Sequence, residues 1–397
     1  MKLATRSPAP RLTVATWWLA AAWTLASTAD SFLLFVLLWI AEPQGWSGTQ
    51  TAVLVIAMRL PTLAGGILGG RAVDRFGPVP MMLLDGMVRT ALMGGLIIAG
   101  IGGTFDLRIV LALGAAAGVT APLSYAAART LVPRLAPPES LAKANALLSV
   151  GDQLPMLLGA ILTGPALALL GTGTAFVLPL LMMLGVTALA IRLRNAPQYE
   201  QTPAPQGVRS RGTRRSTRVI GLIALSVAYY FTYGPYETVL PYYVREQLTS
   251  GLGGYTLLWA LFGTAALLTL PTAAALSRHR PGLVNAAGAI VWGVVMLPLA
   301  FTDHLVVAAI GFAAAGAIWG PYSAVETTAL HRWTDPADHG RIFGTQRALL
   351  ALAAPLGAAV GAVAADHFPP APILAASAIG CTLAGLGACA IPDLRRR

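Results

Sequence analysis

The hydrophobic residues of this chain fall into long blocks separated by short polar segments, and each block is long enough to cross a bilayer. Crossing takes about 20 mostly apolar residues, and a crossing segment must satisfy its own backbone hydrogen bonds, which favours a helix. The blocks lack the strict alternation that is typical of β-barrel strands. The pattern predicts twelve transmembrane helices at about 16–41, 50–70, 80–102, 107–131, 141–170, 173–194, 219–244, 253–277, 283–302, 304–330, 342–365 and 371–391.

Composition agrees with an all-α membrane protein. Of the 397 residues, 56% are hydrophobic and 11% are charged, and that charged share is about half of what soluble domains carry. The net charge of +11 comes without a nucleic-acid-binding motif, so we interpret the charge as topological and expect no nucleic-acid partner.

The basic residues test the helix count. If the chain starts in the cytoplasm, 22 of the 27 Lys and Arg residues lie in segments on that side, and the other side holds Arg108 and Arg245. This asymmetry follows the positive-inside rule only if the number of spans is even. Both termini are therefore expected to be cytoplasmic.

A polar stretch at 195–218, rich in Pro, Gln, Thr, Gly and Arg, divides the spans into six and six. Its composition is typical of a linker. The sequence therefore predicts an N-terminal six-helix bundle at 1–194, a cytoplasmic linker at 195–218 and a C-terminal six-helix bundle at 219–397.

The two halves show traces of a repeat. A shift of 199 residues aligns Pro122 with Pro321 and Ser124 with Ser323, and a shift of 207 aligns Asp30 with Glu237. Two six-helix halves related in this way recur among transporters, so we expect two pseudo-symmetric bundles.

The loop between the second and third spans carries a specific motif: Gly70-Arg71-Ala72-Val73-Asp74-Arg75-Phe76-Gly77. It resembles the G-x-x-x-D-R-x-G signature of the major facilitator superfamily. The resemblance implies that Gly70, Asp74, Arg75 and Gly77 form a gating motif, which links the halves at the cytoplasmic face in the outward-facing state.

The fifth span contains Gly159, Gly164 and Pro165. They resemble a degenerate form of the glycine–proline motif of drug–proton antiporters in that superfamily. A Gly/Pro-rich packing helix is the alternative, because both residues are frequent in membrane helices. Three further segments are similar to the branch of macrolide and siderophore exporters: Lys143-Ala144-Asn145-Ala146 at the start of the fifth span, and Arg341-Ile342-Phe343-Gly344 and Pro355-Leu356-Gly357 in the eleventh.

Standard enzyme motifs are absent from the sequence, including the phosphate-binding loop of ATPases. We therefore expect no enzymatic activity, no metal and no cofactor, and transport that is coupled to an ion gradient.

Charged residues within the spans are candidates for function, because an intramembrane charge costs free energy. No histidine lies at mid-membrane depth, so a proton carrier would be a carboxylate. Asp30 is the first choice, with Arg59 on the neighbouring helix as its partner, and a permanent structural ion pair is the alternative. Asp85 and Arg89, spaced i and i+4, are interpreted as a local pair that supports the nearby loop. The central charges are predicted to be Asp30, Arg59, Asp152, Glu237 and Glu326.

Aromatic residues accompany Glu237 on its helix, where Pro235 predicts a bend. An aromatic face with one carboxylate suits a bulky, apolar, even cationic ligand, whereas an interfacial aromatic belt is the alternative. The predicted cavity residues are Trp23, Tyr230, Tyr233, Tyr236, Trp319 and Tyr322.

These patterns together favour a monomeric, proton-coupled exporter of amphipathic small molecules in the plasma (inner) membrane. An uptake or facilitated carrier of a polar solute is the first alternative, but the spans hold few amides, chiefly Gln153 and Gln346. A membrane-embedded enzyme or receptor is the second alternative.

Overall fold

The computed structural model describes residues 12–102, 105–197, 217–335 and 338–395, and within them all side chains except those of 63–67, 138, 142, 146, 149, 152, 153, 339 and 340. The described chain is helical almost throughout. Its first half contains α1 (Val14–Ala41), α2 (Gly48–Arg59), α3 (Pro61–Phe76), α4 (Pro78–Gly100), α5 (Leu107–Leu135), η1 (Pro138–Ser140), α6 (Leu141–Thr174) and α7 (Val177–Arg194).

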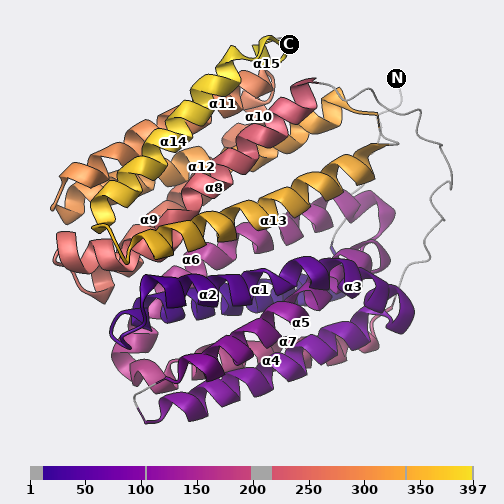
Figure 1. Ribbon diagram of the computed structural model, residues 1–397. Coiled ribbons are helices and arrows are strands. Elements are labelled where there is room, and N and C mark those ends of the chain that lie inside the picture. Colours follow the sequence, from indigo (N-terminus) through magenta and orange to yellow (C-terminus); the bar gives the residue numbers. More distant parts are fainter. Residues whose placement is uncertain (1–11, 103–104, 198–216, 336–337, 396–397) are drawn as a thin grey trace, which may run out of the picture.

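The second half repeats this layout. It contains α8 (Thr217–Tyr242), η2 (Tyr243–Gln247), α9 (Leu252–Thr269), η3 (Leu270–Thr272), α10 (Ala273–Leu276), α11 (Pro281–Met296), η4 (Leu297–Phe301), α12 (Leu305–Trp333), α13 (His339–Ala364), α14 (Pro370–Ala390) and α15 (Pro392–Arg395). Figure 1 shows the two halves as bundles that lie side by side, with α3, α10 and α15 on the same side. We call that side the terminal end of the bundles, and the other side the opposite end.

Eleven spans in the described chain are helical stretches that are long and apolar enough to cross a membrane, and three of them continue through the short segments η2, η3 with α10, and η4. The predicted ranges for these eleven agree with the structure to within four residues. The remaining span is divided into α2 and α3, because Pro61 has no N–H to continue the backbone ladder. The hydroxyl of Thr62 donates to the Arg59 carbonyl at 2.5 Å, which satisfies one of the carbonyls exposed at this break. The twelve-span prediction is thus confirmed.

The bundles meet along two seams, in which α6 packs on α9 and α2 packs on α13. Aromatic side chains fill part of the space between α1 and α9: the rings of Trp39 and Tyr255 stack 5.1 Å apart, and Phe35 lies 5.4 Å from Trp259. The polar linker predicted at 195–218 lies largely outside the described residues.

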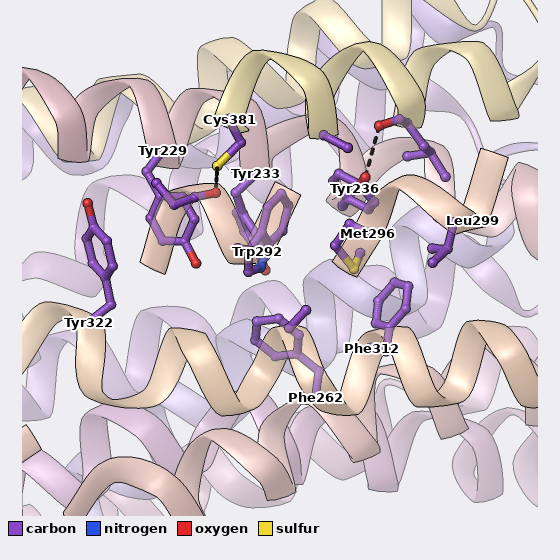
Figure 2. Packing of buried hydrophobic residues seen from close by; sticks show 14 of the residues in the cluster. Tyr229, Tyr233, Tyr236, Phe262, Trp292, Met296, Leu299, Phe312, Tyr322 and Cys381 are labelled. Carbon is purple, nitrogen blue, oxygen red and sulfur yellow. Dashed lines mark hydrogen bonds between the residues drawn. The ribbon is translucent and has the colours of Figure 1, made fainter. Parts of the chain in front are cut away.

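The second bundle has a large buried aromatic core, part of which is drawn in Figure 2. Trp292 lies 5.5 Å from Tyr229 and 5.2 Å from Tyr236 between ring centroids. The Tyr236 hydroxyl donates to the Leu374 carbonyl at 2.9 Å, and the Cys381 thiol donates to the Ala289 carbonyl at 3.3 Å. These contacts fix α8, α11 and α14 against one another.

Close approach of α8 and α13 depends on a glycine. A Cβ atom placed on Gly357 would lie 1.9 Å from the backbone oxygen of Phe231. We expect Gly357→Ala to destabilise the second bundle by about 1–3 kcal/mol, because a methyl group there would push the two backbones apart. Thermal unfolding of the purified protein in detergent measures this.

Gly387→Ala is the matched control, because Gly387 lies in a helix and nothing is within 4 Å of its Cβ position. Equal midpoints for the two variants would contradict the packing argument.

Candidate functional site

A cavity of about 620 Å³ lies between the two bundles. Tyr230, Tyr233 and Glu237 of α8 line it, as do side chains of α12 and α13 from the second bundle. The first bundle contributes residues at the α2–α3 break and in α6. The full lining is Arg59, Thr62, Met156, Tyr230, Tyr233, Glu237, Trp319, Ser323, Glu326, Thr327, Phe343, Gln346, Arg347, Leu350, Ala351, Ala354 and Pro355.

The lining residues run from mid-depth toward the terminal end. The side chain of Arg59 is 45% exposed although it lies at the α2–α3 break within a span. Its guanidinium lies 3.9 Å from the Glu237 carboxylate of the other bundle. Arg347 of α13 also reaches the first bundle, where it donates to the Tyr125 hydroxyl and its guanidinium lies 3.8 Å from the centroid of that ring.

The aromatic residues predicted for the cavity divide into two groups. Tyr230, Tyr233 and Trp319 lie in the wall, and Trp319 is 5.0 Å from Tyr230 and 4.6 Å from Tyr233 between ring centroids. Tyr236 and Tyr322 lie outside the wall, because α8 and α12 turn these side chains into the core of the second bundle.

Trp23 is also outside the cavity wall, and its ring lies 5.3 Å from Tyr125 in an edge-on contact. Sequence reasoning missed several lining residues, among them Met156 and Phe343. Their apolar character gave no signal that would separate them from residues that face lipid.

Asp30 belongs to a different cluster, in the first bundle. Its partner is Arg89 of α4, which donates to it, and not Arg59 as the sequence suggested. Arg89 also lies 3.5 Å from Asp85, one turn earlier on α4, and Asp85 accepts from the Ser124 hydroxyl of α5. Asp30, Asp85, Arg89 and Ser124 thus join α1, α4 and α5, and we call the first three the acidic triad.

Exposure differs sharply within the acidic triad. The side chains of Arg89 and Asp85 are 1% and 0% exposed, whereas that of Asp30 is 45% exposed. Asp85 and Arg89 therefore do more than support the neighbouring loop. They place two carboxylates and one guanidinium together inside the bundle, with Asp30 as the accessible member. The side chain of Asp152, a further predicted central charge, lies outside the described residues.

The gating motif occupies the end of α3 and ends at Gly77, the residue before α4. Gly77 has φ = 90°, a left-handed conformation that favours glycine, and this lets the chain turn directly into α4. Asp74 and Arg75 are exposed, and among the ion pairs of the described residues neither one appears. Gly70 has open space around its Cβ position.

The glycines of the antiporter-type motif lie at helix contacts. A Cβ on Gly159 would meet Ser31 of α1 at 2.8 Å, and one on Gly164 would meet Thr256 of α9 at 3.0 Å. Pro165 is exposed. Gly164 therefore belongs to the seam between α6 and α9.

Polar contacts join the bundles at the opposite end. Arg245, just after α8, binds the Glu42 carboxylate at 2.5 Å, and its guanidinium lies 3.8 Å from the centroid of the Trp39 ring. Asp366, just after α13, accepts from the backbone N–H groups of Gly48 and Thr49 at 2.5 and 2.7 Å and from the Thr49 hydroxyl at 2.6 Å. A carboxylate at the first turn of α2 is also favoured by the helix dipole.

The interactions of Asp366 affect its protonation. Its slight burial would raise its pKa, but the hydrogen bonds from Thr49 and Gly48 outweigh that effect and lower the pKa below the ordinary value of 3.8. The contact is therefore fully present above about pH 4 and is lost as the pH falls through the lowered pKa.

The fold and the cavity together define a class: a multi-pass membrane protein with two helical bundles around a central cavity. The sequence matches the Major Facilitator Superfamily over residues 19–331, and the chain belongs to this family of membrane transporters. It is 28% identical to "Multidrug efflux pump Tap" of Mycobacterium tuberculosis, over 94% of this chain and 92% of that protein.

Two further comparisons agree with this assignment. The chain is 27% identical to "Uncharacterized MFS-type transporter y4rN" of Sinorhizobium fredii, with 93% of each chain covered. A solved structure, a bacterial homologue of the human lysosomal transporter Spinster in an inward-facing and unoccupied conformation, shares the fold with a TM-score of 0.70 at 13% identity, and 95% of each chain is covered.

The contact of Asp366 with the start of α2 can be tested with the variant Asp366→Asn. We expect this change to loosen the contact between α2 and the loop after α13. A cysteine at Ala52, which is 4% exposed and packs against Ala359, should then react several-fold faster with an impermeant thiol reagent. The reporter chain carries alanine at Cys381 and Cys389.

Asp303→Asn, which removes an exposed carboxylate, is the control and should leave the labelling rate unchanged. Because its pKa is lowered, Asp366 stays ionised between about pH 8 and about pH 5. The labelling rate of the reporter chain that keeps Asp366 should therefore stay constant over this range, once it is corrected for ionisation of the thiol. A rate that rises across this range, or one that Asp366→Asn leaves unchanged, would contradict the role of this contact.

Proposed function

We propose that this protein is a proton-coupled exporter of amphipathic or hydrophobic small molecules, embedded in the plasma (inner) membrane with both termini in the cytoplasm. One chain contains both bundles, so a monomer suffices for alternating access. The observation that carries the proposal is the cavity between the bundles, whose wall combines aromatic rings with intramembrane charges.

The cavity has the size and lining that such substrates need. Sites that bury a drug-sized molecule span about 300–1,000 Å³ and are mostly apolar, with a few fixed polar groups, and about 620 Å³ lies within that range. Trp319, Tyr230 and Phe343 offer flat apolar surface, which accepts many ring systems without demanding one hydrogen-bond pattern. The relative Tap, whose name describes a multidrug efflux pump, supports the same direction and substrate class.

The acidic triad supports proton coupling. Two carboxylates share one guanidinium, so the fully ionised triad has one negative charge in excess, and a single proton neutralises it. An uncompensated charge inside a bundle costs free energy. Asp30 is the exposed member of the three. Proton binding at Asp30 would release Arg89 to Asp85 alone and alter the contact between α1 and α4, which couples protonation to a movement of helices.

The contacts between the bundles fit one state of an alternating-access cycle. The opposite end is held by Arg245 and Asp366, whereas Asp74 and Arg75 of the gating motif form no ion pair among the described residues. With cytoplasmic termini, this is an inward-open state that loads substrate from the cytoplasm or the inner leaflet. The reverse state would break the contacts of Arg245 and Asp366 and engage the gating motif.

A carrier of polar solutes is the rival proposal. Such a carrier needs several amides to replace the hydration of a sugar or organic anion, and Gln346 is the one amide in the cavity wall as described. The wall also contains the hydroxyls of Thr62, Ser323 and Thr327. Together with Gln346, these uncharged polar residues are fewer than the apolar and aromatic residues of the wall.

Drug accumulation in efflux-deficient bacterial cells tests the proposal. Cells that express the protein should accumulate several-fold less of at least one amphipathic compound, and a protonophore should abolish the difference. Cells with an empty vector are the control. Unchanged accumulation across a broad panel, or uptake of a polar solute instead, would count against the exporter.

Asp30→Asn tests the coupling. The neutral amide keeps the size of the side chain, so we expect the protein to fold and bind substrate but to lose uphill transport driven by a pH gradient in proteoliposomes, by tenfold or more. Asp303→Asn should transport normally. Undiminished pH-driven transport by Asp30→Asn would refute Asp30 as the proton carrier.

A further inference from the structure

Among the described residues, four charged side chains line the cavity, and three of them are engaged by other groups. Arg59 lies 3.9 Å from Glu237, so these two largely compensate each other. Arg347 donates to the Tyr125 hydroxyl, and its guanidinium lies 3.8 Å from the centroid of that ring. The fourth is Glu326 of α12, and none of the ion pairs among the described residues includes it.

The carboxylate of Glu326 can accept a further hydrogen bond. Its side chain is 1% exposed, and its Oε1 atom has no hydrogen-bond partner within the described part of the chain. Ser226 and Gln346 interact with the carboxylate as neutral neighbours. Burial of a carboxylate without a cation costs free energy, and a buried acceptor without a donor at the wall of a cavity is a position that a ligand can satisfy.

Aromatic rings surround the same part of the wall. Tyr230 and Tyr322 lie near enough to Glu326 to interact with its charge, and the rings of Tyr230 and Trp319 are 5.0 Å apart. The faces of tyrosine and tryptophan rings attract a cation within about 6 Å of their centroids, more strongly when water is excluded. The carboxylate is shielded from water, which strengthens its attraction to a positive charge.

We infer that Glu326 anchors the positively charged centre of a lipophilic cation, whose apolar body lies against Tyr230 and Trp319. This inference rests on the proposed function of the cavity and narrows its substrate class to organic cations with delocalised or shielded charge. Glu237 is not the anchor, because Arg59 already compensates its charge.

Glu326 as a second proton carrier is the competing role, and the two roles have different consequences. An anchor matters for charged substrates only, whereas a proton carrier matters for every substrate that is moved uphill. Neutral and cationic ligands of matched shape therefore separate them.

The binding experiment uses the full-length protein in lipid nanodiscs, with tetraphenylphosphonium as the cation and triphenylphosphine oxide as the neutral analogue. Equilibrium dialysis, corrected with empty nanodiscs, measures both dissociation constants. Glu326→Gln should weaken binding of the cation at least tenfold and change binding of the neutral compound less than twofold. Glu326→Asp should retain part of the cation binding. Glu246→Gln is the matched control, since Glu246 is exposed near the opposite end of α8, and it should bind both compounds normally.

The outcomes are distinguishable. If Glu326→Gln, with an unchanged thermal midpoint, binds the cation as tightly as the unaltered protein, the inference is overturned and the proposed function stands. If the variant also loses pH-driven transport of the neutral compound in proteoliposomes, Glu326 is a proton carrier and the inference is equally overturned. If the unaltered protein binds neither compound and expressing cells accumulate every tested drug normally, the proposed function itself fails. If Glu326→Gln does not fold, the two dissociation constants are measured for Glu326→Asp instead. Its shorter side chain must then weaken binding of the cation more than binding of the neutral compound.

Discussion

A charged side chain inside a bilayer loses its hydration, and compensation for that loss organises the interior of this protein. Arg89 lies between Asp30 and Asp85, and Arg59 faces Glu237 across the two bundles. The Asp30–Arg89 and Arg59–Glu237 contacts join helices that are distant in sequence, whereas Asp85 and Arg89 lie one turn apart on α4. Glu326 departs from this arrangement, and it does so in the wall of the cavity.

The same constraint separates permanent packing from contacts that a transport cycle can exchange. Within the second bundle, close backbone approach at Gly357 and the aromatic core around Trp292 leave little freedom. Between the bundles, Arg245 and Asp366 make the polar contacts at the opposite end. Water can replace polar contacts at little cost in free energy, so the bundles can part there while each keeps its own core.

Much of the architecture was predictable from the sequence. Hydrophobic blocks give the spans to within a few residues, because the thickness of the hydrocarbon sets the length of a helix whatever surrounds it. The distribution of arginines requires an even number of spans, and the motif at 70–77 indicates the superfamily that the whole-chain comparison confirms. Arg245 also carried a signal in the sequence, as one of two basic residues outside the spans on its side. The structure places it in a contact between the bundles.

What the sequence left undecided is the rotation of each helix about its own axis. In a soluble helix the polar face marks the outside, but here lipid-facing and core-facing positions are both apolar, so hydropathy with a period of 3.6 residues is weak. For this reason Tyr236 and Tyr322 were expected in the cavity and lie in the bundle core, whereas Tyr230 and Tyr233 line the cavity. For the same reason Asp85 and Arg89 resembled a local pair, and only the assembly of the first bundle brings Asp30 of α1 to Arg89 of α4. The sequence by itself determined which segments cross the membrane and which charges enter it. The tertiary structure decided which of those charges meet, because that depends on how side chains of neighbouring helices interlock.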